Sequence, residues 1–92
     1  MFIPESFEEE LRFLSVVAGA SIGNILLSED RVAKHLPYSW KDEDVSQHLL
    51  KAARHINTHM QIAAGYQKDD GENHLDNAIT RLAMALGKGA GK

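Results

Sequence analysis

The 92-residue chain contains no cysteine. A chain of this length buries only about 60–65% of its unfolded surface, and disulfides, a bound metal or self-association usually supplement so thin a core. The absence of cysteine excludes disulfides, iron–sulfur clusters, thiolate zinc sites and cysteine nucleophiles. We therefore expect a single domain at residues 1–87, completed by self-association and followed by a flexible glycine-rich tail at residues 88–92.

Composition excludes several classes of protein. Hydrophobic residues make up 43% of the chain and charged residues 25%, which is typical of a folded globular protein. Ten basic and 13 acidic side chains give a net charge of −3, so there is no direct evidence for nucleic-acid binding. No apolar run approaches the roughly 18 to 20 residues that cross a bilayer, and the N-terminus lacks signal-peptide features. We predict no membrane partner and a cytoplasmic location.

Apolar residues recur at helical spacing, whereas strand-like alternation is almost absent. The first helix is predicted to start at an N-cap, Ser6, and the pattern leaves open whether it continues, kinks or restarts at Gly19 and Gly23. The other predictions are a helix from Ser28 to before Pro37, a loop at 37–40, a helix from Asp42 to about Tyr66, a turn at 67–71, and a helix from about residue 72 to Leu86 capped by Gly87. We predict an all-α fold, a small helical bundle built on a long antiparallel helical hairpin and completed by oligomerisation.

The long helix predicted from Asp42 has a broad apolar face bordered by three histidines. At about 100° per residue, His48, His55 and His59 cluster along one edge of that face. The apolar face is expected to enter the core, and its members are Val45, Leu49, Ala52, Ala53, Ile56, Met60, Ala63 and Ala64.

Two groups of residues have the chemistry of metal ligands. His55 and His59 lie one helical turn apart, so both imidazoles could meet one ion or anion; they could equally be polar residues at the edge of the core. Four carboxylates follow within eight positions, at Asp69, Asp70, Glu72 and Asp76. Carboxylate oxygens suit Mg²⁺ or Mn²⁺, although aspartates in such a segment also build turns and cap helices.

Other side chains near these groups could contact a substrate. Arg54 could pair with phosphate beside the titratable ring of His55, or could be simply solvated. Trp40 could stack on a nucleobase, or could cover the end of the bundle. His74 lies inside the acidic group, and it joins His55 as a candidate for moving or orienting a proton.

Several segments, read in order, resemble a known family. They are Tyr38-Ser39-Trp40-Lys41, Leu50-Lys51-Ala52-Ala53-Arg54-His55, Gly65, Asp69-Asp70-Gly71-Glu72 and His74-Leu75-Asp76-Asn77-Ala78. This series, which covers about residues 37 to 86, is similar to the dATP/dGTP diphosphohydrolase family of phages and bacteria. The resemblance implies an all-helical domain related to MazG-like nucleotide pyrophosphohydrolases, which use Mg²⁺ or a similar ion held by acidic side chains. It places Arg54, His55, Asp69, Asp70 and His74 at or beside the nucleotide.

The leading functional hypothesis is therefore a metal-dependent hydrolase that converts a purine dNTP to dNMP and pyrophosphate in a bacterial or phage-infected cell. The metal ligands are expected among Asp69, Asp70, Glu72 and Asp76, with Mg²⁺ or Mn²⁺ as the ion. The catalytic residues are expected to be His55 and His74, and the substrate-binding residues Arg54, Trp40 and His59. We expect a homodimer or higher homo-oligomer with sites near subunit boundaries.

Two other hypotheses stay open. The small size, and the lack of the paired glutamate motif of MazG enzymes, also fit a non-catalytic, phage-encoded helical regulator that binds nucleotide or a protein. The histidine stripe along the long helix also fits an assembly whose oligomeric state responds to pH.

Overall fold

The chain folds into helices joined by short loops. The computed structural model describes residues 3–90, and no strand occurs within that range. The elements are α1 (Phe7–Leu26), α2 (Glu29–Lys34), the 3-10 helix η1 (Ser39–Asp42), α3 (Val45–Ala63) and α4 (His74–Ala90). The all-α prediction is therefore confirmed. Among the described helices, none has the length and apolar character required to cross a bilayer.

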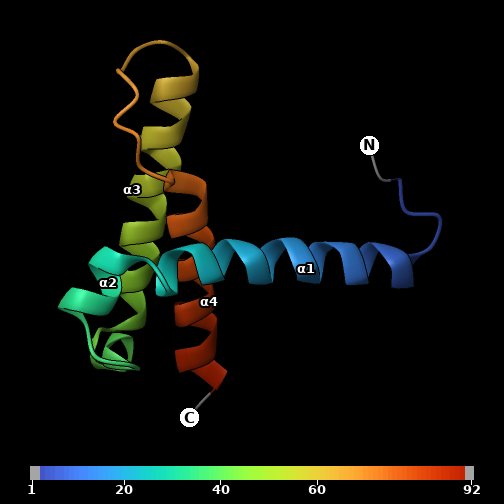
Figure 1. Ribbon diagram of the computed structural model, residues 1–92, viewed down its shortest axis with the longest axis horizontal. Helices are drawn as coiled ribbons and strands as arrows, with labels where there is room; N and C mark the ends of the chain where they lie inside the picture. Colours follow the sequence, from blue (N-terminus) through green and yellow to red (C-terminus); the bar gives the residue numbers. More distant parts are fainter. Residues whose placement is uncertain (1–2, 91–92) are drawn as a thin grey trace.

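Helices α3 and α4 form the predicted antiparallel hairpin (Figure 1). The buried apolar residues of the chain are few and mostly small, namely Ala52 on α3 and Ala78, Met84 and Ala85 on α4. Small side chains allow the two helices to approach closely, but they bury little apolar area. The hairpin core is consequently thin, as the length of the chain implies.

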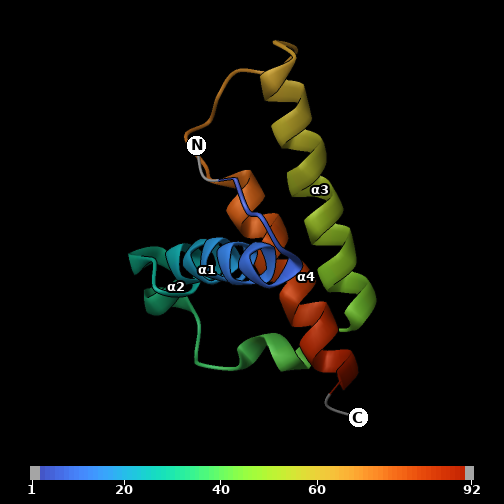
Figure 2. The same ribbon diagram turned by 90° about the vertical axis from the view of Figure 1, so that its right-hand side faces the viewer.

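The first half of helix α1 extends away from the hairpin, and its second half crosses α4 (Figures 1 and 2). It starts at the expected N-cap, where the Ser6 hydroxyl accepts a hydrogen bond of 3.1 Å from the Glu9 amide. It then continues without interruption through Gly19 and Gly23 to Leu26, which resolves the open question about this segment. The second half of α1 lies against α4, where the Ser21 hydroxyl and the Asn24 amide donate to the Asp76 carboxylate.

The end of α3 differs from its prediction. The pattern extends this helix to about Tyr66, but it ends at Ala63 because Gly65 adopts a left-handed backbone conformation with φ of +83°. The Gly65 amide donates to the Ile62 carbonyl at 3.1 Å, and the Tyr66 amide donates to the Gln61 carbonyl at 2.9 Å. This pair of bonds is the Schellman arrangement that satisfies the last carbonyls of a helix.

The end of α4 also differs. Gly87 is not the C-cap, because α4 continues through residues 88–90, the first part of the expected flexible tail. The Lys88 ammonium donates to the Lys41 carbonyl at 2.6 Å and to the Glu43 carbonyl at 2.5 Å, which ties this turn to η1. Gly87 lies under the Trp40 ring, so a Cβ there would be 3.5 Å from the indole. Residues 91–92 of the expected tail lie outside the described range.

Only one edge of the predicted apolar face of α3 meets α4. Ala52 from that face is buried beside His48, whereas Leu49, Ala53 and Met60 are exposed. His48 and His55 of the histidine border meet Arg81 and His74 of α4, while His59 is exposed. Much of the apolar face of α3 consequently has no cover within the single chain.

A partly buried polar network at the η1 end of the hairpin accounts for this rotation. The Arg81 guanidinium donates to Glu43 Oε2 at 2.6 Å and to His48 Nδ1 at 3.1 Å. Since His48 Nδ1 accepts, its Nε2 carries the proton and donates to the Trp40 carbonyl at 2.8 Å. Hydrogen bonding from Lys51, together with Arg81, lowers the pKa of Glu43 to about 2. His48 is fully buried, and the network satisfies it without an apolar contact face.

Candidate metal centre

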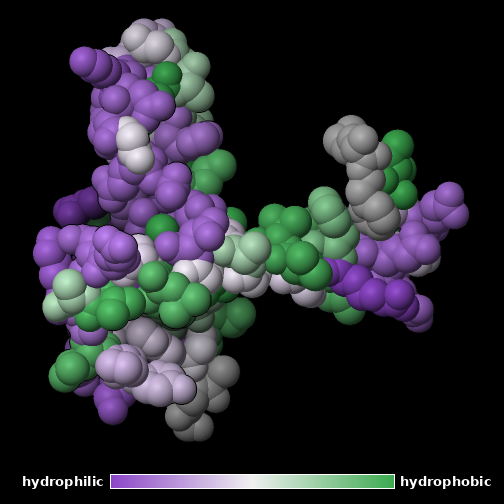
Figure 3. Space-filling model, in the orientation of Figure 1, coloured by the Kyte–Doolittle hydropathy of each residue, from purple (hydrophilic) through white to green (hydrophobic). Residues whose placement is uncertain are grey.

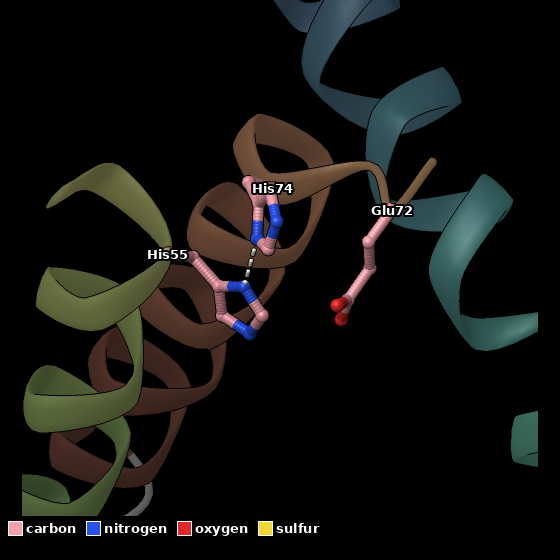
Figure 4. A group of neighbouring side chains, drawn as sticks. All are labelled: His55, Glu72 and His74. Carbon is pink, nitrogen blue, oxygen red and sulfur yellow. Dashed lines mark hydrogen bonds between the residues drawn. The ribbon is translucent and has the colours of Figure 1, made fainter. Parts of the chain in front are cut away.

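Three side chains at the other end of the hairpin converge on one point. His55 comes from α3, His74 is the first residue of α4, and Glu72 comes from the connection that precedes it (Figure 4). One ligand atom from each lies within 4.8 Å of the others. His74 is buried, His55 half-buried and Glu72 exposed, so the cluster opens towards solvent on the Glu72 side.

The connection between α3 and α4 is shaped by its own aspartates. Asp69 Oδ1 accepts a hydrogen bond of 2.8 Å from the Gly71 amide, and Asp70 Oδ1 accepts one of 2.9 Å from the Glu72 amide. Aspartate favours local turns of this kind. Gly71, which both turns include, adopts the positive φ of +75° that glycine accepts without strain. The segment therefore returns to α4 in a defined path that carries Glu72 to the imidazoles.

Asp70 fixes the orientation of His74. Its carboxylate oxygens lie 2.9 and 3.0 Å from His74 Nε2, and a carboxylate only accepts, so Nε2 must carry a proton. In the neutral ring the lone pair is then at Nδ1, which faces His55. A histidine whose second nitrogen donates to a carboxylate is the usual arrangement of a metal-binding imidazole.

The two imidazoles face each other through their Nδ1 atoms, which are 2.9 Å apart. In the absence of an ion this is a hydrogen bond from His55 Nδ1–H to His74 Nδ1. Two nitrogens that bind one ion at about 2.05 Å lie about 2.9 Å apart at a right angle and about 3.3 Å apart at the tetrahedral angle. The observed spacing is that of a hydrogen bond, so binding of one ion by both rings requires them to move slightly apart and turn both Nδ1 atoms towards the ion.

The local electrostatics favour the neutral form of His55, which is the form that binds a metal ion. Burial lowers the pKa of His55, with the charges of His74 and Arg81 adding to it and those of Glu72 and Asp70 opposing it. Hydrogen bonds from the Glu72 amide and from His74 lower the pKa of Asp70. A neutral His55 beside ionised carboxylates is the protonation pattern that metal binding requires.

Two hollows meet at Glu72. One has a volume of about 310 Å³ and is lined by His59, Ile62, Ala63, Asp69, Glu72, Asn73, His74, Leu75 and Asp76. The other has a volume of about 330 Å³ and is lined by Asn24, Ile25, Ser28, Asp30, Arg31, His35, Gly71, Glu72, Asn73 and Asn77. Together they leave the cluster accessible to a small polar ligand.

Three further residues predicted for the site lie beside the first hollow. Asp69 and His59 line the first hollow. Asp76 also lines it, but its carboxylate accepts hydrogen bonds from Ser21 at 2.5 Å and Asn24 at 3.4 Å, and so joins α1 to α4.

Two other predicted residues lie apart from these hollows. Arg54 is exposed on α3 next to His55 in the sequence. Trp40 packs beside Gly87, 13 residues along α4 from His74, which is about 20 Å of helix. The structure thus brings together His55, His74, Glu72 and Asp70, and leaves Trp40 at the opposite end.

Arg31 was not considered from the sequence alone. It lies on α2 and lines the second hollow beside Glu72 and Asn73, where it supplies a cation on the open side of the cluster. The only sequence signal is its place in a short capped helix, which does not predict which residues of the hairpin it faces.

Comparisons with protein-family models, curated proteins and solved structures yield no match to this chain.

Proposed function

We propose that the chain is a metal-dependent nucleoside triphosphate diphosphohydrolase that acts on purine dNTPs and holds its metal ion between α3 and α4. The single observation that carries the proposal is the convergence of His55, His74 and Glu72 within 4.8 Å, with Asp70 orienting His74. The choice of substrate rests on the motif resemblance over residues 37 to 86.

The ligand set favours Mn²⁺ over Mg²⁺. Mg²⁺ prefers an all-oxygen shell with several waters, whereas imidazole nitrogens suit transition metals, and Mn²⁺ accepts both nitrogen and carboxylate oxygen. In this proposal His55 and His74 act as ligands, and Glu72 supplies a carboxylate oxygen. Asp69 and Asp70 support the site from the connection.

The reaction breaks the bond between the α-phosphorus and the bridging oxygen and forms a new bond from that phosphorus to a water oxygen. A bound divalent ion supplies charge neutralisation of the phosphates and lowers the pKa of a bound water. The products are dNMP and pyrophosphate, and the water releases its protons to solvent or to a nearby carboxylate. Asp69 lines the hollow next to the ligands and is placed to accept a proton.

One arginine lies beside the proposed phosphate position. Arg31 lines the hollow on the Glu72 side, whereas Arg54 is exposed on α3 and lines neither hollow. Guanidinium groups bind phosphate oxygens through paired N–H donors and offset the charge that develops on them. In this proposal His59 contacts the substrate from the first hollow. Trp40 lies at the opposite end of the hairpin, so only a Trp40 from another copy of the chain could stack on the nucleobase.

Calorimetric titration with Mn²⁺ tests the metal site. The wild-type chain should bind one ion per chain with saturation, and His55→Ala and His74→Ala should each weaken binding by at least tenfold. His59→Ala is the matched control, because His59 lines the same hollow without belonging to the cluster, and it should bind normally. Absence of saturable binding in the wild-type chain, or equal loss in all three variants, would contradict the proposal.

Incubation of dATP or dGTP with the Mn²⁺-loaded chain tests the reaction. The expected products are the corresponding monophosphate and pyrophosphate in equal amounts, detected by chromatography and a coupled pyrophosphate assay. Saturable binding of metal and nucleotide without pyrophosphate release would instead favour the non-catalytic nucleotide-binding regulator.

A further inference from the structure

A third hollow, lined mainly by apolar side chains, lies where the end of α1, α2 and η1 meet. It has a volume of about 460 Å³, and Figure 3 shows hydrophobic side chains gathered beside α2, at the lower left of the view. The volume and the apolar lining are those of a small-molecule site. The apolar lining includes Leu26, Leu27, Val32 and Leu36, together with the rings of Tyr38 and Trp40.

Arg31 adds one positive charge to this apolar hollow. Among the described residues that line it, Arg31 alone carries a full charge, and His35 adds an imidazole. The neighbouring acid Asp30 lines the polar hollow beside Glu72 instead, and it pairs with Lys34 at 2.8 Å. The lining of the apolar hollow is therefore positively charged, although α2 as a whole is not.

The Arg31 guanidinium has no counter-ion of its own. The Arg31 amide donates to the Ser28 hydroxyl, but no hydrogen bond or ion pair in the described part of the chain involves the guanidinium. The side chain is half-buried, and burial and the charge of Arg81 lower the pKa of Arg31, while Glu43 opposes them. Glu43 is itself bonded to Lys51 and Arg81. Since arginine stays protonated, binding an anion would offset the cost of this partly dehydrated charge.

We propose that the apolar hollow binds a small apolar monocarboxylate, with its carboxylate on Arg31 and its apolar part against Val32 and Trp40. A carboxylate matches the planar guanidinium and accepts two N–H hydrogen bonds from it. The proposal requires neither the metal ion nor the nucleotide, so it can fail or succeed independently of the proposed function. Because Arg31 lines both hollows, the carboxylate and a substrate phosphate would compete for one guanidinium.

Simpler ligands match only one feature of the hollow. A neutral apolar molecule would cover the apolar side chains but would leave Arg31 without a counter-ion. A small anion such as acetate would pair with Arg31 but would bury little apolar area. A molecule with both parts satisfies both features, and octanoate is a simple probe of this class.

The emission of Trp40 tests the proposal, because Trp40 is the only tryptophan of the chain and lines the hollow. Titration of the full chain with octanoate, without added metal, should change this emission with saturation. The dissociation constant should be at least about tenfold lower for octanoate than for 1-octanol or acetate. Calorimetric titration should give one octanoate per chain with the same constant. Absence of saturable binding, or calorimetric binding that leaves the Trp40 emission unchanged, would overturn the proposal.

Three variants test the role of each part. Arg31→Gln should raise the dissociation constant for octanoate by at least about tenfold and leave that for 1-octanol unchanged. Lys34→Gln is the matched control, because Lys34 lies on the same short helix but pairs with Asp30 and does not line the hollow, and it should bind octanoate normally. Val32→Asn changes a side chain that is 63% exposed, so it should preserve the far-UV circular dichroism while weakening binding of both octanoate and 1-octanol.

The opposite results are equally specific. Equal losses in Arg31→Gln and Lys34→Gln, or unchanged octanoate binding in Val32→Asn, would overturn the proposal. Trp40 emission that ignores octanoate but changes with chain concentration would show instead that a second copy of the chain covers the hollow.

Discussion

Asp70 touches the candidate centre only through His74, so its contribution can be separated from ligation. Asp70→Asn keeps the side-chain shape but removes the negative charge. It also replaces one carboxylate oxygen with an NH2 group, which cannot accept a hydrogen bond from His74 Nε2. We expect Mn²⁺ affinity to fall about 10- to 100-fold, as for other carboxylates behind a metal-binding histidine. Calorimetric titration measures the change.

Asp69→Asn is the matched control for this variant. Asp69 makes the equivalent turn one residue earlier, where its Oδ1 accepts from the Gly71 amide. A similar loss of affinity in both variants would show that the turn, and not the contact with His74, governs the site.

The charge of Glu43 links two helices of the hairpin. Its carboxylate joins Lys51 on α3 to Arg81 on α4, so Glu43→Gln should lower the free energy of unfolding by about 1–3 kcal/mol. Urea unfolding measures this change, and Asp42→Asn on the exposed end of η1 should be nearly neutral. An equal effect of both substitutions would contradict the network described above.

The same carboxylate predicts a pH dependence. The pKa of Glu43 falls from 4.5 to about 2 on folding, so its stabilising effect is complete above pH 4.5 and is lost as the pH falls through about 2. The difference in unfolding free energy between wild type and Glu43→Gln should therefore shrink steadily between pH 4.5 and pH 2. A difference that stays constant over this interval would contradict the assignment.

Among the helices, α3 shows how a single backbone position sets a boundary. Gly65 has φ of +83°, a conformation that costs an alanine about 1 kcal/mol or more. Gly65→Ala should therefore destabilise the chain by about that amount. Gly19→Ala should do the opposite and add about 0.5–1 kcal/mol, because Gly19 is inside α1 with open space around it. Thermal unfolding of both variants measures these changes, and a shift of the same sign in both would contradict them.

The elements could largely be predicted from sequence, whereas the helix faces could not. Caps such as Ser6 and Ser28 are local signals, and both accept hydrogen bonds as expected. Arg81, which is distant in sequence, donates a hydrogen bond to His48. His48 is therefore buried against α4, whereas Leu49 is exposed. Periodicity identifies an apolar face without showing which neighbouring helix will cover it.

For the candidate site, the sequence indicates the residue types but not how their side chains pair. The residue types at positions 55, 70, 72 and 74 indicate metal chemistry, and a helical hairpin brings them to one place. Sequence alone does not indicate that Asp70 pairs with His74, while Asp76 turns instead to Ser21 on α1. That difference arises from the docking of α1 onto α4, which is a tertiary contact.

For the molecule as a whole, the thin hairpin core leaves room for self-association to add stability. If folding and dimerisation are linked, dilution must lower stability by mass action. The thermal midpoint of the wild type should then fall on tenfold dilution. Differential scanning calorimetry at two concentrations measures this, and a midpoint independent of concentration in the wild type would argue against linkage.

The central claim is that α3 and α4 hold one divalent ion between His55, His74 and Glu72. Titration of Mn²⁺ into the chain, followed by nuclear magnetic resonance of the five histidine rings, tests it most directly, because the paramagnetic ion broadens nearby signals first. We predict that the ring signals of His55 and His74 disappear at a small fraction of one equivalent, while that of His48, two helical turns away on α3, persists to higher ratios. Equal broadening of all five rings, or earlier broadening at the glutamates of α1, would contradict the claim.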